Sequence, residues 1–290
     1  MSISRQDIWI PAAVLVLVLG STGAGRAETL LERGAYLMNS IVACGNCHTP
    51  QGPDGPLPGM ELAGGLVIED PGFTVQVPNI TPDPDTGIGS WTDQEIITAI
   101  REGRRPDGSV IGPPMPIEVY RDMSDQDVQA LVAYLRQVPA VRNAVAPNQY
   151  GFPLPASYGP PVTSVPEVPR DDPVAYGAYL AGPLGHCTVC HTPLVEGRLD
   201  FANRLGAGGF EFQGPWGVSV SRNITPDVAT GIGAWSDADI KRAITEGIRP
   251  DGTRLLPPMP VAYYANMEEQ DLDALVTWLR ALPPQVTEPR

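Results

Sequence analysis

Apolar residues recur at helical spacing three times in the first half of the chain. The first such stretch covers residues 30–42. The second follows Thr92, which forms a predicted capping box with Glu95, and Gly103 marks its predicted end. The third follows Ser124 and has four apolar residues on one face, namely Val128, Leu131, Val132 and Leu135. These patterns predict three helices.

The second half of the chain shows the same pattern. We predict helices at residues 174–184 and between the cap Ser236 and the terminating Gly247. The apolar face of the last helix carries Leu272, Leu275, Val276 and Leu279. No segment alternates convincingly between apolar and polar residues, so we expect no strands and an all-α fold.

The composition requires long loops between these helices. The chain has 33 prolines and 31 glycines among 290 residues, nearly twice the usual share of about 12 %. Its net charge is −14, and Lys241 is its only lysine. Without a basic stripe, nucleic-acid binding is not expected.

The two halves are copies of one sequence. The run 44–48 recurs 143 residues later as 187–191, with the same Cys-x-x-Cys-His spacing. The runs 79–91 and 223–235 are identical at 10 of 13 positions. We therefore expect one domain at residues 28–142 and a second at 173–290. A linker with seven prolines, residues 143–172, joins them.

The N-terminus has the pattern of an export signal. Arg5 precedes an apolar stretch of twelve residues, Ile8 to Leu19, and small residues follow up to Ala27. We predict a signal peptide at residues 1–27 and a periplasmic location. An uncleaved anchor is the alternative reading of this segment.

Cys-x-x-Cys-His is the attachment signature of c-type haem. Two thiols three positions apart on a helical turn can add to the two vinyl groups of one haem, and the next residue can bind the iron. A redox-active cysteine pair needs no such histidine, and a zinc site needs four ligands. We therefore expect two covalently bound haem c groups, attached through Cys44, Cys47, Cys187 and Cys190, with His48 and His191 as iron ligands.

The second axial ligand of each iron follows by elimination. The remaining histidine, His186, lies beside Cys187 on the attachment side. Each half offers two methionines at matching positions. Met115 and Met259 lie in Pro-Pro-Met-Pro, where prolines fix the backbone, and we predict them as iron ligands. Met123 and Met267 precede the last helix of each half, where we expect them to pack as hydrophobic staples.

The repeated run Asn-Ile-Thr-Pro-Asp, followed by Thr-Gly-Ile-Gly-x-Trp, has two readings. It could face the haem, with Asn79 and Asn223, or Trp91 and Trp235, bonding a propionate. Alternatively, it supplies turn chemistry before a helix. The residue types favour neither reading over the other.

These motifs resemble the dihaem and trihaem cytochrome c subunits of membrane-bound bacterial alcohol, gluconate and aldehyde dehydrogenases. The resemblance covers both repeats and includes the run from Met115 to Tyr120. It implies two tandem class I-like cytochrome c domains, each with about three to five helices and long Pro/Gly loops around one covalent haem. It also implies the Cys, His and Met roles given above.

The resulting functional hypothesis is a periplasmic dihaem electron carrier, an electron-transfer subunit rather than an enzyme on its own. It would pass electrons from a dehydrogenase catalytic subunit to a respiratory-chain acceptor, with peripheral membrane association through that partner. The alternative is a dihaem peroxidase or sulfur-compound oxidoreductase, which needs one labile iron site and an acid/base group. Two matching methionine motifs and few histidines count against it.

Overall fold

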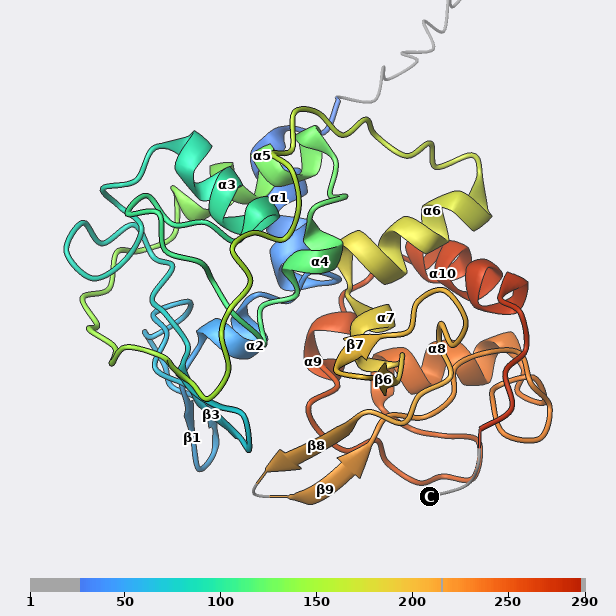
Figure 1. Ribbon diagram of the computed structural model, residues 1–290. Coiled ribbons are helices and arrows are strands. Elements are labelled where there is room, and N and C mark those ends of the chain that lie inside the picture. Colours follow the sequence, from blue (N-terminus) through green and yellow to red (C-terminus); the bar gives the residue numbers. More distant parts are fainter. Residues whose placement is uncertain (1–26, 215, 288–290) are drawn as a thin grey trace, which may run out of the picture.

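The computed structural model describes residues 27–214 and 216–287. The predicted signal peptide, residues 1–27, therefore lies almost wholly outside the described residues. We call residues 28–142 the first repeat, 143–172 the linker and 173–290 the second repeat. Figure 1 shows two lobes, one built by each repeat, that meet along their helices. No helix in the described part of the chain is long and apolar enough to cross a membrane.

The helices of the two repeats correspond in order. The first repeat contains α1 (Leu30–Asn39), α2 (Gly45–His48), α3 (Asp93–Glu102), α4 (Ile117–Tyr120) and α5 (Asp125–Leu135). The second repeat contains α6 (Pro173–Tyr179), the π-helical turn η1 (Leu180–Leu184), α7 (Cys187–Cys190), α8 (Asp237–Glu246), α9 (Val261–Tyr264) and α10 (Glu269–Ala281). The predicted helix at 174–184 is therefore α6 followed by a π-turn that contains Pro183, because proline cannot donate the helical hydrogen bond at its position.

Local sequence signals explain the boundaries of α3 and α8. The Thr92 hydroxyl accepts from Glu95 N–H at 3.2 Å, and the Glu95 carboxylate accepts from Thr92 N–H at 2.7 Å. Ser236 and Asp239 make the same capping box on α8. Gly103 and Gly247 end the two helices with φ of 62° and 66°, a left-handed conformation that glycine adopts without a Cβ clash. The predicted boundaries of these helices are confirmed.

The expectation of an all-α fold is wrong, because both repeats also contain antiparallel sheets. The first repeat has the hairpin β1 (Gln51–Gly52)–β2 (Gly55–Pro56) and the hairpin β3 (Val67–Asp70)–β4 (Phe73–Gln76). Strand β5 (Gln149–Tyr150), from the linker, pairs with β4. The second repeat has the hairpins β6 (Leu194–Val195)–β7 (Arg198–Leu199) and β8 (Glu211–Gly214)–β9 (Gly217–Val220). Strands of two to four residues are too short for a clear period of two, which is why the sequence did not reveal them.

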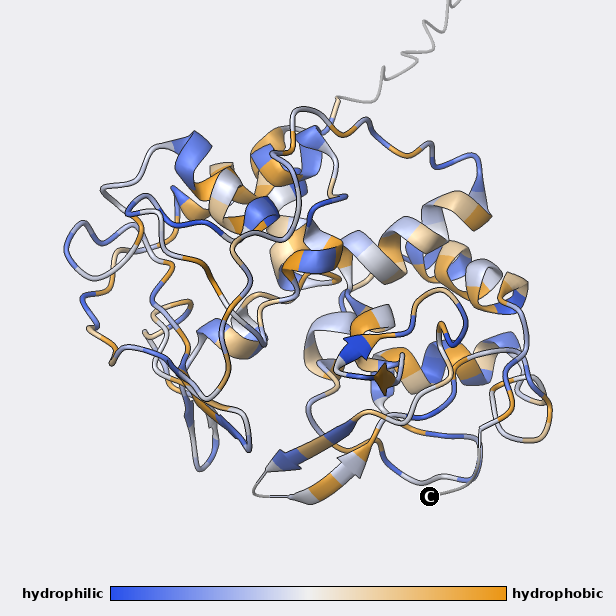
Figure 2. Ribbon diagram, viewed as in Figure 1, coloured by the Kyte–Doolittle hydropathy of each residue, from blue (hydrophilic) through white to orange (hydrophobic). Residues whose placement is uncertain are grey.

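In each repeat the first and last helices cross at a glycine. A Cβ on Gly34 of α1 would lie 2.0 Å from the Ala130 carbonyl oxygen of α5, and one on Gly177 of α6 would lie 2.1 Å from that of Ala274 in α10. Only glycine lets the two backbones approach this closely. Figure 2 shows apolar and polar segments alternating along α6 and α10, as expected for helices with one buried face.

The linker lies over the first repeat. The Tyr150 hydroxyl donates to the Pro113 carbonyl at 3.0 Å, and the Tyr158 hydroxyl donates to the Ile111 carbonyl at 2.9 Å. Further along, Asp125 N–H donates to the Val165 carbonyl at 2.9 Å. The linker then reaches α6 across the top of the molecule in Figure 1.

Candidate haem sites

A cavity of about 3060 Å³ extends through both repeats. All eight residues predicted to bind haem line it: Cys44, Cys47, His48, Met115, Cys187, Cys190, His191 and Met259. In each repeat the fold thus brings two thiols, an imidazole and a thioether to one cavity, although the methionine lies more than 60 residues from the histidine. This donor set fits haem c, which uses two thioether attachments and two axial ligands.

Each attachment motif lies at a short helix, and the residue before its first cysteine has a left-handed backbone. Ala43 precedes Cys44 with φ of 49°, and His186 precedes Cys187 with φ of 42°. Such conformations are uncommon for residues with a Cβ and persist where the surrounding structure enforces them. His48 N–H then donates to the Cys44 carbonyl at 2.9 Å. The resulting helical turn carries both cysteines of the motif into the cavity.

The four cysteines are not joined in disulfides. Burial raises the pKa of Cys44 to about 12, of Cys187 to about 11 and of Cys190 to about 12, and it also raises the pKa of Cys47. The side chains are therefore neutral thiols at neutral pH.

Both histidines are oriented through the ring nitrogen that faces the protein. His48 Nδ1 donates to the Pro78 carbonyl at 2.8 Å, and His191 Nδ1 donates to the Arg222 carbonyl at 2.7 Å. Such a bond fixes the tautomer and leaves Nε2 as the acceptor for a metal. Burial lowers the pKa of both imidazoles, so each is held in the neutral form that can bind iron.

The structure separates the two methionines of each repeat. Met115 and Met259 line the cavity, and each follows a cis Pro-Pro bond and precedes a short helix, α4 or α9. Met123 and Met267 are 0 % and 7 % exposed and belong to the hydrophobic core, outside the cavity lining. This placement matches a ligand role for the first pair and a packing role for the second.

Hydrogen bonds hold the Asn-Ile-Thr-Pro-Asp run, both within the loop and to the segment that follows the last helix of the repeat. Asn79 Nδ2 donates to the Val141 carbonyl at 2.7 Å and to Thr86 Oγ1 at 3.1 Å, while Asn79 Oδ1 accepts from Thr81. Asn223 makes the equivalent bonds in the second repeat. The asparagine amide is thus committed to the turn rather than to a propionate. Trp91 and Trp235 line the cavity.

His186 lies at the boundary between the two repeats. It lines the cavity, and its ring is 6.0 Å from that of Tyr120 in the first repeat, at an interplanar angle of 74°. Burial lowers the pKa of His186 to about 4. It is therefore an uncharged packing residue at neutral pH.

One set of side-chain contacts, present in both repeats, was not predicted from the sequence. Arg136 Nε donates to Asp93 at 2.9 Å and, through its other nitrogens, bonds the carbonyls of Ile88 and Trp91. Arg280 does the same in the second repeat. These arginines hold the loop that carries the cavity tryptophan. Their recurrence at the repeat offset was a usable signal.

Comparison with known proteins agrees with this geometry. The cytochrome c family model matches residues 31–139 and 174–283, one match in each repeat. The cytochrome c subunit of the quinone-dependent alcohol dehydrogenase of Gluconobacter oxydans is 33 % identical over 95 % of this chain and 60 % of its own length. The gluconate 2-dehydrogenase cytochrome c subunit of Pantoea cypripedii is 30 % identical over 93 % of this chain and 65 % of its own length.

A third relative has nearly the same length as this chain. The diheme cytochrome c-type protein of Cereibacter sphaeroides is 31 % identical over 92 % of this chain and 88 % of its own length. By contrast, the chain spans less than two thirds of the alcohol and gluconate dehydrogenase subunits. Family membership implies covalently bound haem c, and two matched domains are consistent with two such groups. The chain belongs to the cytochrome c family.

Proposed function

We propose that this chain holds two covalently bound haem c groups and carries electrons between redox proteins. The observation that carries this proposal is the recurrence of one donor set, two cysteines, a histidine and a methionine, on a single cavity in both repeats. Haem c supplies an iron that alternates between the ferrous and ferric states. Electron transfer then needs positioning and exclusion of water rather than a substrate pocket.

The protein residues hold and tune these groups. Cys44 and Cys47 would anchor one haem, and His48 would offer its free Nε2 to the iron while Nδ1 stays bonded to the Pro78 carbonyl. Met115, which lines the same cavity, would supply its thioether sulfur to that iron. Ligation by histidine and methionine would raise the reduction potential of the iron. The second repeat uses its four equivalent residues in the same way.

We further propose that the electron donor is a dehydrogenase catalytic subunit and that the acceptor belongs to a respiratory chain. The names of the relatives support this, because several are cytochrome c subunits of dehydrogenases for alcohol, fructose and gluconate. The export pattern at residues 1–27 supports a periplasmic location. Association with a membrane would then be peripheral and occur through the partner.

The peroxidase alternative requires the two sites to differ. In the structure both repeats place the same four residues, two cysteines, a histidine and a methionine, on the cavity, and each methionine lies in the same Pro-Pro-Met-Pro context. This equivalence favours the electron carrier.

Haem quantification tests the proposal. The protein, expressed with its export signal in a host that matures c-type cytochromes, should contain two haems per chain that resist acid–acetone extraction. Cys44→Ala with Cys47→Ala should leave one. A count of one for the unmodified chain, or haem that is extracted, would refute the proposal. Turnover of peroxide above a free-haem control would support the alternative.

A further inference from the structure

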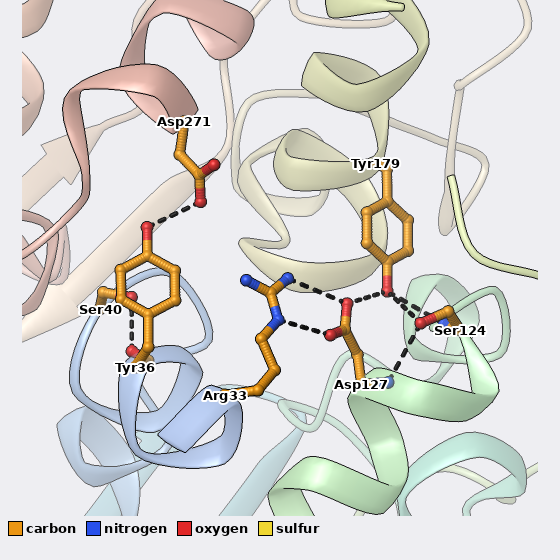
Figure 3. A network of polar contacts seen from close by, with 7 residues as sticks. All are labelled: Arg33, Tyr36, Ser40, Ser124, Asp127, Tyr179 and Asp271. Atoms are coloured by element: carbon orange, nitrogen blue, oxygen red, sulfur yellow. Dashed lines mark hydrogen bonds and ion pairs between the residues drawn. The ribbon is translucent and has the colours of Figure 1, made fainter. Parts of the chain in front are cut away.

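Two equivalent tyrosine–aspartate pairs join the repeats at their interface. The Tyr36 hydroxyl of α1 donates to Asp271 Oδ2 of α10 at 2.7 Å. The Tyr179 hydroxyl of α6 donates to Asp127 Oδ2 of α5 at 2.6 Å. Tyr36 and Tyr179 occupy the same position in the two repeats, as do Asp127 and Asp271. Each repeat therefore donates a tyrosine to the other repeat's aspartate, as Figure 3 shows.

Each tyrosine also accepts a backbone hydrogen bond from the opposite repeat. Ser124 N–H donates to the Tyr179 hydroxyl at 3.0 Å, and Glu268 N–H donates to the Tyr36 hydroxyl at 3.1 Å. Ser124 and Glu268 are the caps of α5 and α10. Each hydroxyl thus binds both the first turn and the cap of a helix in the opposite repeat. The reciprocal contacts relate the two repeats by an approximate twofold axis, as in an isologous dimer.

The same arrangement brings the attachment helices α2 and α7 to this interface. A Cβ on Gly45 of α2 would lie 2.2 Å from the Tyr263 hydroxyl, and one on Gly185, two residues before Cys187, would lie 2.7 Å from Ile41 Cδ1. The two attachment motifs therefore lie close to the interface, one on each side of it.

We propose that Tyr36 and Tyr179, through Asp271 and Asp127, are positioning residues that fix the spacing of the two haems for direct electron transfer between them. This inference rests on the proposed function. In the step itself one electron leaves a ferrous iron in one repeat and reduces a ferric iron in the other. No bond forms or breaks and no proton is released, so the step depends on the spacing that the interface maintains.

Within the described ranges, only one of the two tyrosine–aspartate contacts has a cation beside its carboxylate. Arg33 Nε donates to Asp127 Oδ1 at 2.7 Å, whereas the position equivalent to Arg33 in the second repeat is Tyr176. Asp271 is fully buried, and its Oδ1 has no hydrogen-bond partner among the described residues. Tyr36→Phe therefore leaves a buried carboxylate without its side-chain donor, while Tyr179→Phe leaves Asp127 still bonded to Arg33. We expect the first substitution to loosen the interface more.

The test compares Tyr36→Phe, Tyr179→Phe and the double variant in the complete haem-loaded protein. A hydrogen bond to a carboxylate shifts an equilibrium by roughly ten- to hundredfold, so the double variant should populate separated repeats. Pulsed EPR between the two ferric irons should show a broader and longer distance distribution. The rate of electron transfer between the haems should fall by about tenfold or more. Tyr158→Phe is the matched control, because its hydroxyl bonds only a backbone carbonyl in the first repeat.

Haem content separates this inference from the proposed function. Variants with two haems per chain, an unchanged iron–iron distance and an unchanged transfer rate would overturn the positioning role while leaving the function intact. If the double variant fails to fold, the single variants decide. Equal effects of Tyr36→Phe and Tyr158→Phe on the distance distribution would then refute the inference.

Discussion

The buried ion pair between Arg33 and Asp127 gives a quantitative prediction. Arg33→Met removes the cation and leaves an aspartate whose side chain is 7 % exposed. The pair makes two contacts, at 2.7 and 3.3 Å. The Tyr179 hydroxyl continues to donate to the carboxylate after the substitution.

The expected loss follows from burial rather than from the ionic attraction alone. Breaking a buried pair by removing one partner costs about 3–5 kcal/mol, because a charge is left uncompensated. The retained bond from Tyr179 places the expected loss at the lower end, about 3 kcal/mol. Replacing both partners, Arg33→Met with Asp127→Leu, removes the uncompensated charge and should recover part of this loss, although the hydrogen bond from Tyr179 is lost as well. The two substitutions should therefore be strongly non-additive.

Urea unfolding of the haem-loaded protein, followed by far-UV circular dichroism, measures these differences. Arg142→Met is the control, because Arg142 pairs with Asp85 at the surface, where the two side chains are 74 % and 60 % exposed. This substitution should lower the unfolding free energy by less than about 0.5 kcal/mol. A loss below about 1 kcal/mol for Arg33→Met would refute the reasoning. A double variant as unstable as the sum of the single variants would refute it as well.

Two further substitutions test the local account of the fold. Gly34→Ala forces a Cβ to within 2.0 Å of the Ala130 carbonyl oxygen, so we expect the unfolding free energy to fall by about 2–3 kcal/mol. At an open helical site the same substitution would raise the unfolding free energy by about 1 kcal/mol. An increase in stability would therefore show that the two helices do not cross this closely. Thr92→Ala removes the cap of α3 and should lower the unfolding free energy by about 1 kcal/mol in the same experiment. Thr92→Ser keeps the hydroxyl and should lower it far less. Equal losses for the two variants would contradict the capping role.

Some elements could be predicted to the residue and others could not. The limits of α3 follow from the Thr92 cap and from Gly103, because both signals are local and chemically specific. The hairpins were missed because strands such as β1 and β8 are only two to four residues long. Strand β5 was missed for another reason. It lies in the proline-rich linker and exists because β4 offers it an edge, which is a tertiary contact.

The same distinction applies to the site. Cys-x-x-Cys-His carries its chemistry in adjacent residues, so the sequence alone predicts the attachment and proximal ligands. The methionines were chosen by elimination, and the structure places Met115 and Met259 on the cavity. The contacts of Tyr36 and Tyr179 could not be predicted, because each joins residues from different repeats. The matching positions of these tyrosines at the repeat offset were the only available sign.

The sulfur-to-iron charge-transfer band of the ferric protein tests the central claim most directly. If Met115 and Met259 are the sixth ligands, Met115→Ala and Met259→Ala should each remove about half of the band, and together they should abolish it. Met123→Ala, which alters only the hydrophobic core, should leave the band intact. A full-strength band in both ligand variants, or its loss in Met123→Ala, would contradict the account.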